Sequence, residues 1–153
     1  MNKLVYLIAT VAALGMLTTS VFARDLVNVS GSSGIALDGY DPVAFFVDKK
    51  QVHGDPSISA TYRGAKYFLA SKEHKALFEA DPKKYVPQFG GYCAFGVAEG
   101  ALFPVDINTW QVWNDKLYLN LKPAVLKLFN KDVAGYVAKA EKNWPDLVKK
   151  NAK

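Results

Sequence analysis

The chain has 153 residues, of which 50% are hydrophobic and 22% are charged, with 19 Lys and Arg residues against 14 Asp and Glu residues. The hydrophobic share is too high for an intrinsically disordered protein, and the length fits one ordinary domain. With one Cys, two His and two Met, the chain cannot build a disulfide framework or a zinc site that needs two or more thiolates.

Residues 1–23 have the three parts of a cleavable secretory signal. Lys3 gives a positive start, and Leu4 to Leu17 is an uncharged apolar stretch, shorter than the roughly 20 residues of a spanning helix. Ala23 ends a small-residue cleavage motif, so we expect a cut after it and a periplasmic or secreted protein without a membrane span. An uncleaved anchor is the alternative, but polar residues 18–20 end the apolar run.

Three segments are expected after the signal. Residues 24–36 form a flexible leader, because Ser30 to Gly34 contains only Ser and Gly. Residues 37–146 form one folded domain, and residues 147–153 form a basic C-terminal tail. No internal repeat or linker indicates a second domain.

The domain opens on an Asp-Pro pair. Asp41 followed by Pro42 is typical of a helix N-cap with proline at the first helical position, which predicts a short helical turn or a strand entry over residues 43–46. A strand over residues 43–47 that pairs with residues 51–53 is the alternative.

Two hairpins and several helices follow. Residues rich in β-formers predict hairpins for residues 59–62 with 66–69 around Arg63-Gly64, and for residues 110–113 with 116–121 around Asn114-Asp115. Helices are expected over residues 72–80, capped by Ser71 with Leu77 and Phe78 facing inward, over a short turn from Pro82 to Tyr85, and over two C-terminal segments, residues 124–129 and 133–140. The fold class is therefore α+β: a small single domain of twisted antiparallel β-hairpins packed with short helices and a C-terminal helical segment.

Lysines are concentrated in the C-terminal part of the chain, from Lys116 onward. They alternate with the positions that face the core, as on any solvated helix face, and an exported protein rarely meets nucleic acid. We therefore expect no nucleic-acid partner. The oligomeric state does not follow from the sequence.

Four ordered motifs resemble the exported proteins with a YHS domain, and the similarity runs from about residue 37 to residue 144. The motifs are residues 38–46 (DGYDPVAFF), 62–67 (YRGAKY), 70–85 (ASKEHKALFEADPKKY) and 90–94 (GGYCA). The resemblance implies a small α+β domain with a twisted sheet, and it leaves the activity undefined. In YHS domains attached to heavy-metal transport ATPases, cysteines in a DPVC segment and in a C-x-x-x-C segment are taken to bind metal.

This sequence departs from that pattern at each thiol. Ala44 stands at the first cysteine position, Ala70 at the second and His74 at the third. The cysteine of the exported branch lies instead in the GGYCA motif, here Cys93. The resemblance therefore supports the fold more firmly than the metal site.

Cys93 has two readings. The Gly90-Gly91 pair before it favours a helix start at Tyr92, which would place the thiol at a positive helix end and lower its pKa, so that it becomes a ligand or a nucleophile. The alternative is a buried and inert thiol, because free cysteine is among the most buried residue types and aromatic residues flank Cys93.

The other candidates are two histidines and one acid. His74 is either a partly exposed helix residue or a metal ligand at the position where related domains carry a thiolate. His53, next to Gly54, fits a surface turn or a further ligand, and Asp41 fits a helix cap or part of a ligand shell.

Three functions are compatible with these residues. The leading one is a metal-binding or metal-handling module for copper or zinc with His74, Cys93, His53 and Asp41 as candidate ligands. The second is a module that binds a small molecule or a protein without metal, which the many aromatic residues would suit. The third is a thiol-dependent redox protein that uses Cys93, although no C-x-x-C motif is present. We expect a binding protein and not an enzyme, with a metal ion or a small molecule as its partner.

Overall fold

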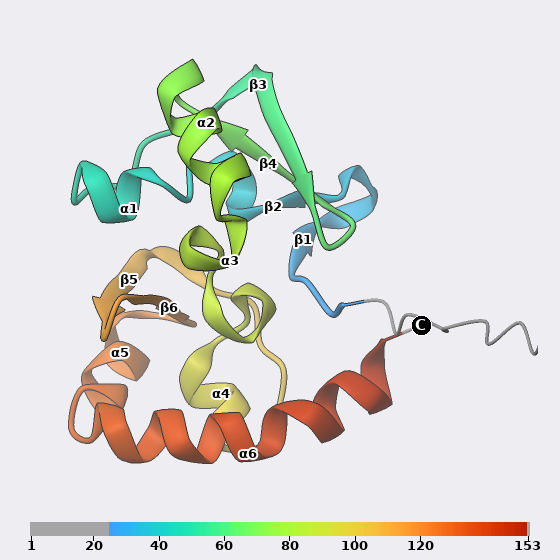
Figure 1. Ribbon diagram of the computed structural model, residues 1–153. Coiled ribbons are helices and arrows are strands. Elements are labelled where there is room, and N and C mark those ends of the chain that lie inside the picture. The colour runs from blue at the N-terminus through green and yellow to red at the C-terminus, as the bar shows by residue number, and fades with distance from the viewer. Residues whose placement is uncertain (1–24, 153) are drawn as a thin grey trace, which may run out of the picture.

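The computed structural model describes residues 25–152, so the expected signal lies outside the described residues. Figure 1 shows two sheets with helices packed around them and a long C-terminal helix along one side. The strands are β1 (Val29–Ser30), β2 (Ile35–Ala36), β3 (Asp55–Tyr62), β4 (Ala65–Leu69), β5 (Asp106–Trp113) and β6 (Lys116–Asn120). The helices are α1 (Ala44–Val47), α2 (Lys72–Ala80), α3 (Pro82–Tyr85), α4 (Ala94–Ala98), α5 (Pro123–Phe129) and α6 (Val133–Asn151), with 3₁₀ turns at Gly31–Ser33, Leu37–Gly39 and Gln88–Gly91.

Both predicted hairpins are confirmed. β3 pairs antiparallel with β4 and β5 pairs antiparallel with β6. Arg63 and Gly64 both have left-handed φ angles of 51° and 77°, and Asn114 and Asp115 have 48° and 55°. Two consecutive left-handed residues match the right-handed twist of the flanking strands, which is why these pairs close the hairpins.

The first sheet contains more than its hairpin. Its strand order is β1-β2-β4-β3, and β2 lies parallel to β4 through Ile35 and Lys66. The prediction of a flexible leader over residues 24–36 is therefore wrong for its described part. The backbone N–H of Asn28 donates to the carbonyl oxygen of Gly90 at 2.8 Å, and Val27 and Val29 pack against the core. Burial of these apolar side chains holds the segment in place.

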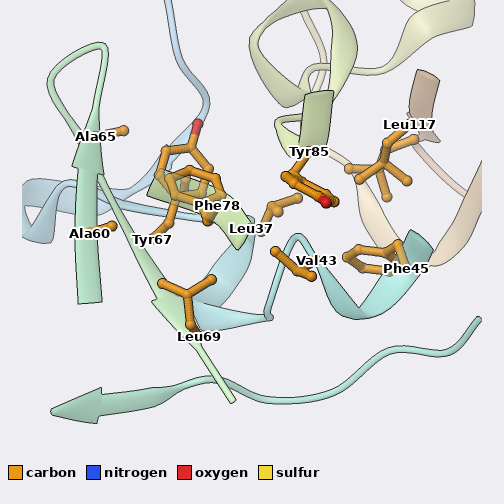
Figure 2. Close-up of a cluster of buried hydrophobic side chains, with 12 residues drawn as sticks. Leu37, Val43, Phe45, Ala60, Ala65, Tyr67, Leu69, Phe78, Tyr85 and Leu117 are labelled. Atoms are coloured by element: carbon orange, nitrogen blue, oxygen red, sulfur yellow. The ribbon is translucent and has the colours of Figure 1, made fainter. Parts of the chain in front are cut away.

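β6 separates two hydrophobic cores because successive side chains of a strand point to opposite faces. Leu117 and Leu119 enter the first core, and Tyr118 between them enters the second. The first core lies between the four-stranded sheet and helices α1 to α3, and Figure 2 shows part of it. The second core lies between α4, α5 and α6 and includes Phe89 and Phe129.

The predicted helices are present, with differences at single residues. Ser71 caps α2 by accepting a hydrogen bond from the His74 backbone N–H at 3.1 Å. Phe78 is buried as expected, but Leu77 is 42% exposed, so its predicted inward position is wrong. α6 continues to Asn151, which places the start of the predicted basic tail inside a helix. Within residues 25–152, no helix combines the length and the apolar character that crossing a membrane requires. The α+β fold class is confirmed.

Candidate functional site

Asp41 is a fully buried carboxylate at the start of α1. Its Oδ1 accepts hydrogen bonds from the backbone N–H groups of Val43 at 2.7 Å and of Ala44 at 3.4 Å. Asp41 therefore stabilises the turn that leads into α1, but the predicted N-cap at Asp41 is wrong, since Val43 has the N-cap position. The alternative strand over residues 43–47 is not formed. The backbone N–H of Asp41 itself donates to the Val52 carbonyl oxygen at 2.8 Å, which fixes the residue from a second side.

The other carboxylate oxygen of Asp41 reaches two residues that lie far away in the sequence. Oδ2 accepts a hydrogen bond from the Ala70 backbone N–H at 2.7 Å and contacts Nδ1 of His74 at 2.6 Å. With four donors, both oxygens of the buried carboxylate are satisfied, which offsets the cost of taking the group out of water. Asp41 thereby joins α1, the end of β4 and α2.

His74 is held in one orientation by this contact. A carboxylate that already takes three N–H donors acts as an acceptor, so Nδ1 carries a proton, and in the neutral ring Nε2 offers its lone pair. Nε2 lies 4.0 Å from Oδ2 of Asp48, and the His74 and Asp48 side chains are 13% and 33% exposed. The outer nitrogen of His74 thus sits beside a second carboxylate near the surface.

Asp48 is a member of this site that the sequence did not indicate. It follows directly after α1, where an acidic residue in the Asp48-Lys49-Lys50 run reads as an ordinary turn residue. The contact joins two residues that are 26 positions apart, and no local spacing in the sequence signals it.

Cys93 lies elsewhere, at the N-terminal end of α4. The residue is 2% exposed, and its Sγ accepts a hydrogen bond from the Gly96 backbone N–H at 3.4 Å and lies 3.7 Å from Oδ1 of Asn120. Figure 1 places α4 and α2 in different halves of the molecule, so Cys93 and His74 do not share a site. The expectation of a helix that begins at Tyr92 is also wrong, since α4 begins at Ala94.

Burial raises the pKa of the Cys93 thiol, and three backbone hydrogen bonds oppose the shift only in part. The expected lowering at a helix start is therefore not found. Cys93 has the character of a protonated thiol in the core, as the alternative reading of the sequence described.

We predict that the native protein alkylates with iodoacetamide at pH 8 at least about tenfold more slowly than the urea-unfolded chain, because both burial and protonation suppress the thiolate. Since the folded pKa is raised, the stability contribution of the neutral thiol is present below the ordinary thiol pKa and is lost as the pH rises through the folded value. Equal alkylation rates in the two states, or a rate midpoint below the free-thiol value of about 8.5, would contradict this placement.

His53 is exposed and packs on an aromatic neighbour. It forms an isolated antiparallel bridge with Tyr40, and the two rings lie 3.9 Å apart between centroids. Because consecutive residues of an extended segment point to opposite faces, the Tyr40 and His53 rings lie on the face opposite to the Asp41 carboxylate. His53 therefore takes no part in the contact between Asp41 and His74.

The described residues contain no cluster of three or more His, Cys, Asp and Glu side chains that could hold a metal ion. Of the four candidate ligands, the structure brings Asp41 and His74 together, adds Asp48, and separates Cys93 and His53 from them. Any ion bound at this place would have His74 and Asp48 as its protein ligands and water in its other positions.

Comparison with known proteins found no match: no family model, no curated protein and no solved structure is similar to the chain.

Proposed function

We propose that this chain is an exported YHS-like domain that binds divalent copper or zinc through Nε2 of His74, with Asp48 as the second protein ligand. The observation that carries the proposal is the fixed geometry of His74 between two carboxylates, 2.6 Å from Asp41 and 4.0 Å from Asp48. Histidines that ligate metals almost always give their other ring N–H to a carboxylate or a carbonyl oxygen, and Asp41 has that position here.

The resemblance to YHS domains gains support from the surroundings of Asp41. Ala44, Ala70 and His74, which stand at the three cysteine positions of the metal-binding relatives, all contact the Asp41 carboxylate. Positions that are 26 and 30 residues apart in the sequence thus meet at one point, as a shared metal site would require. In this chain the Asp41 carboxylate lies where these three positions meet, in contact with two backbone N–H groups and one imidazole.

The distances suit a nitrogen and an oxygen ligand on one small ion. Two ligands at about 2.0–2.2 Å from a tetrahedral zinc ion lie about 3.4 Å from each other, so the 4.0 Å gap needs only a small rotation of the Asp48 side chain. Imidazole nitrogen is a ligand common to copper and zinc. A site with two protein ligands keeps coordination positions open, which suits the transfer of a metal more than its permanent storage.

Binding is proposed in preference to catalysis because of the partners of His74. Both side chains that flank its ring are carboxylates, which leaves the imidazole without a nucleophile to activate. A thiol-dependent redox function is disfavoured because Cys93 is buried and its pKa is raised.

The metal proposal predicts a defined pattern of affinities. The protein, purified without a histidine tag, is expected to bind one Cu²⁺ or Zn²⁺ ion in a calorimetric titration, and His74→Gln is expected to abolish this binding. Asp48→Asn should weaken it at least about tenfold, and Asp41→Asn should weaken it about 10- to 100-fold by releasing the imidazole.

Two variants serve as matched controls for this titration. His53→Gln removes the other histidine and Cys93→Ala removes the only thiol, and both are expected to bind metal as the wild type does. Weak uptake that is equal in the wild type and in His74→Gln would refute the proposal. Loss of binding in Cys93→Ala alone would show that the thiol is the ligand.

A further inference from the structure

A second site lies between the two cores, away from His74. A cavity of about 250 Å³ is bounded by the N-terminal segment, the β3–β4 turn, α3, the turn before α4, and α6. None of its lining residues belongs to the proposed metal site. Cavities at the junction of two packed units are common places for small ligands, and this one has room for a molecule of about ten non-hydrogen atoms.

Tyr67 supplies a hydroxyl group to this cavity. The residue is 2% exposed, it belongs to the first core, and it lines the cavity. In Figure 2 its hydroxyl oxygen points out of the cluster toward the N-terminal segment. The hydroxyl makes no hydrogen bond with another residue of the described chain. Burial raises the pKa of Tyr67, and the Arg63 guanidinium opposes the shift only in part, so the phenol stays protonated and can donate a hydrogen bond.

Arg63 supplies a positive group at the edge of the cavity, where its side chain is 45% exposed. Its Nε lies 3.4 Å from Oδ2 of Asp25, and its guanidinium carbon lies 5.3 Å from the centre of the Tyr62 ring. These two contacts use the inner edge and one face of the guanidinium. The terminal nitrogens make no recorded bond with a described residue, and a guanidinium fork of this kind fits a carboxylate better than a point charge would.

Three further charged residues line the cavity besides Arg63: Asp25, Glu141 and Lys83. Asp25 is paired with Arg63, and Glu141 at the rim lies 3.6 Å from Lys116. Lys83, on α3, lines the cavity and has no recorded ion pair within residues 25–152. Because Asp25 and Glu141 are each paired with a basic side chain, Lys83 is the lining charge that is left for an anionic ligand.

The opposite wall is aromatic. Trp144 lines the cavity with Phe89, and the two rings lie 5.9 Å apart. Trp144 also lies 6.5 Å from Tyr92, so its indole is held by neighbours on two sides. A flat apolar group can stack on such a wall at little cost in side-chain entropy.

We infer that this cavity binds a small aromatic monocarboxylate, with its carboxylate on Arg63 and the Tyr67 hydroxyl, its ring against Trp144, and Lys83 at the entrance. The site combines the neutral Tyr67 hydroxyl, the Arg63 guanidinium and an aromatic wall, which are the kinds of groups that orient such a ligand. It is independent of metal at His74.

The test uses phenylacetate as the probe, with its neutral amide and phenethylamine as probes of equal shape. In calorimetric titrations, phenylacetate is expected to bind at least about tenfold more tightly than either of the others, because hydrogen bonds to charged groups are the stronger ones. Tyr67→Phe should weaken phenylacetate binding about fivefold and Arg63→Gln about tenfold, whereas Lys83→Gln should weaken it about threefold.

Two matched control variants remove a tyrosine hydroxyl and a lysine charge at positions that do not line the cavity. Tyr85→Phe alters another buried tyrosine of the first core, and Lys84→Gln alters the neighbouring lysine of α3, and neither residue lines the cavity. Both controls are expected to bind phenylacetate as the wild type does. The inference is overturned if phenethylamine binds more tightly than phenylacetate, if Tyr67→Phe and Arg63→Gln bind phenylacetate unchanged, or if no probe binds the folded protein.

Discussion

Replacing Asp41 with Asn is expected to lower the free energy of unfolding by about 3 kcal/mol, although the two side chains have almost the same shape. Each carboxylate oxygen of Asp41 faces two N–H groups: those of Val43 and Ala44 at Oδ1, and those of Ala70 and His74 at Oδ2. An asparagine must place its NH₂ group at one of these positions. At the Oδ1 position the NH₂ group would face the N–H groups of Val43 and Ala44, and at the Oδ2 position it would face the Ala70 N–H and require His74 Nδ1 to lose its proton, in a site that water does not reach.

Urea unfolding at pH 7 measures this loss, and Asp132→Asn is the matched control. Asp132 caps α6 at an exposed position by accepting a hydrogen bond from the Gly135 backbone N–H at 2.9 Å. Asparagine caps helices about as well as aspartate, so this variant should lose less than about 0.5 kcal/mol. A loss below about 1 kcal/mol for Asp41→Asn would mean that the carboxylate is not the centre of the hydrogen-bond network described above.

Gly54→Ala is the second substitution with a large expected effect, a loss of about 3 kcal/mol. A Cβ atom at Gly54 would lie well inside van der Waals contact with the backbone carbonyl of Phe68, which cannot move without distorting the sheet. The Gly54 N–H also donates to the Gly39 carbonyl oxygen at 2.9 Å, in the segment that leads to Asp41. The added methyl group would therefore displace the segment that leads from Gly39 to Asp41 as well as β4.

Gly64→Ala is the control that distinguishes the steric overlap expected in Gly54→Ala from backbone strain. Gly64 has a left-handed φ of 77°, but a Cβ there meets no atom within 4 Å. Alanine at this position should lower the free energy of unfolding by about 1 kcal/mol through backbone strain alone, because its methyl group meets no other atom. Thermal and urea unfolding of both variants provide the comparison, and losses of equal size would contradict the close approach of Gly54 to Phe68.

The sequence predicted the structure best where neighbours in the chain decide it. The Arg63-Gly64 and Asn114-Asp115 turns, the Ser71 cap and the short helical turn after Pro42 all depend on residues within four positions of one another. Burial was predicted less well. Leu77 and Phe78 both fit an inward stripe, but helix packing covers only Phe78, because the first core reaches one side of α2.

The contacts of the candidate site could not be predicted, because they are made across the fold. The Asp-Pro pair predicts a helix cap, but α1 has Val43 at its N-cap position and Asp41 Oδ1 stabilises the turn before it. The 33-residue gap from Asp41 to His74 gives no local pattern. Asp48 looked like a turn residue for the same reason. The parallel pairing of β2 with β4 is equally non-local. The Ser- and Gly-rich composition therefore predicts a flexible leader, although Val27 and Val29 pack against the core.

The central claim is that metal binds at the outer nitrogen of His74, and a Cu²⁺ titration followed by ¹H–¹⁵N NMR tests it most directly. Paramagnetic broadening at substoichiometric Cu²⁺ marks the residues nearest to the ion. We expect that the amide signals of His74 and Asp48 broaden first, that the signal of Cys93 stays sharp, and that His74→Gln removes the effect. Broadening centred on Cys93 or His53, or an unchanged response in His74→Gln, would contradict it.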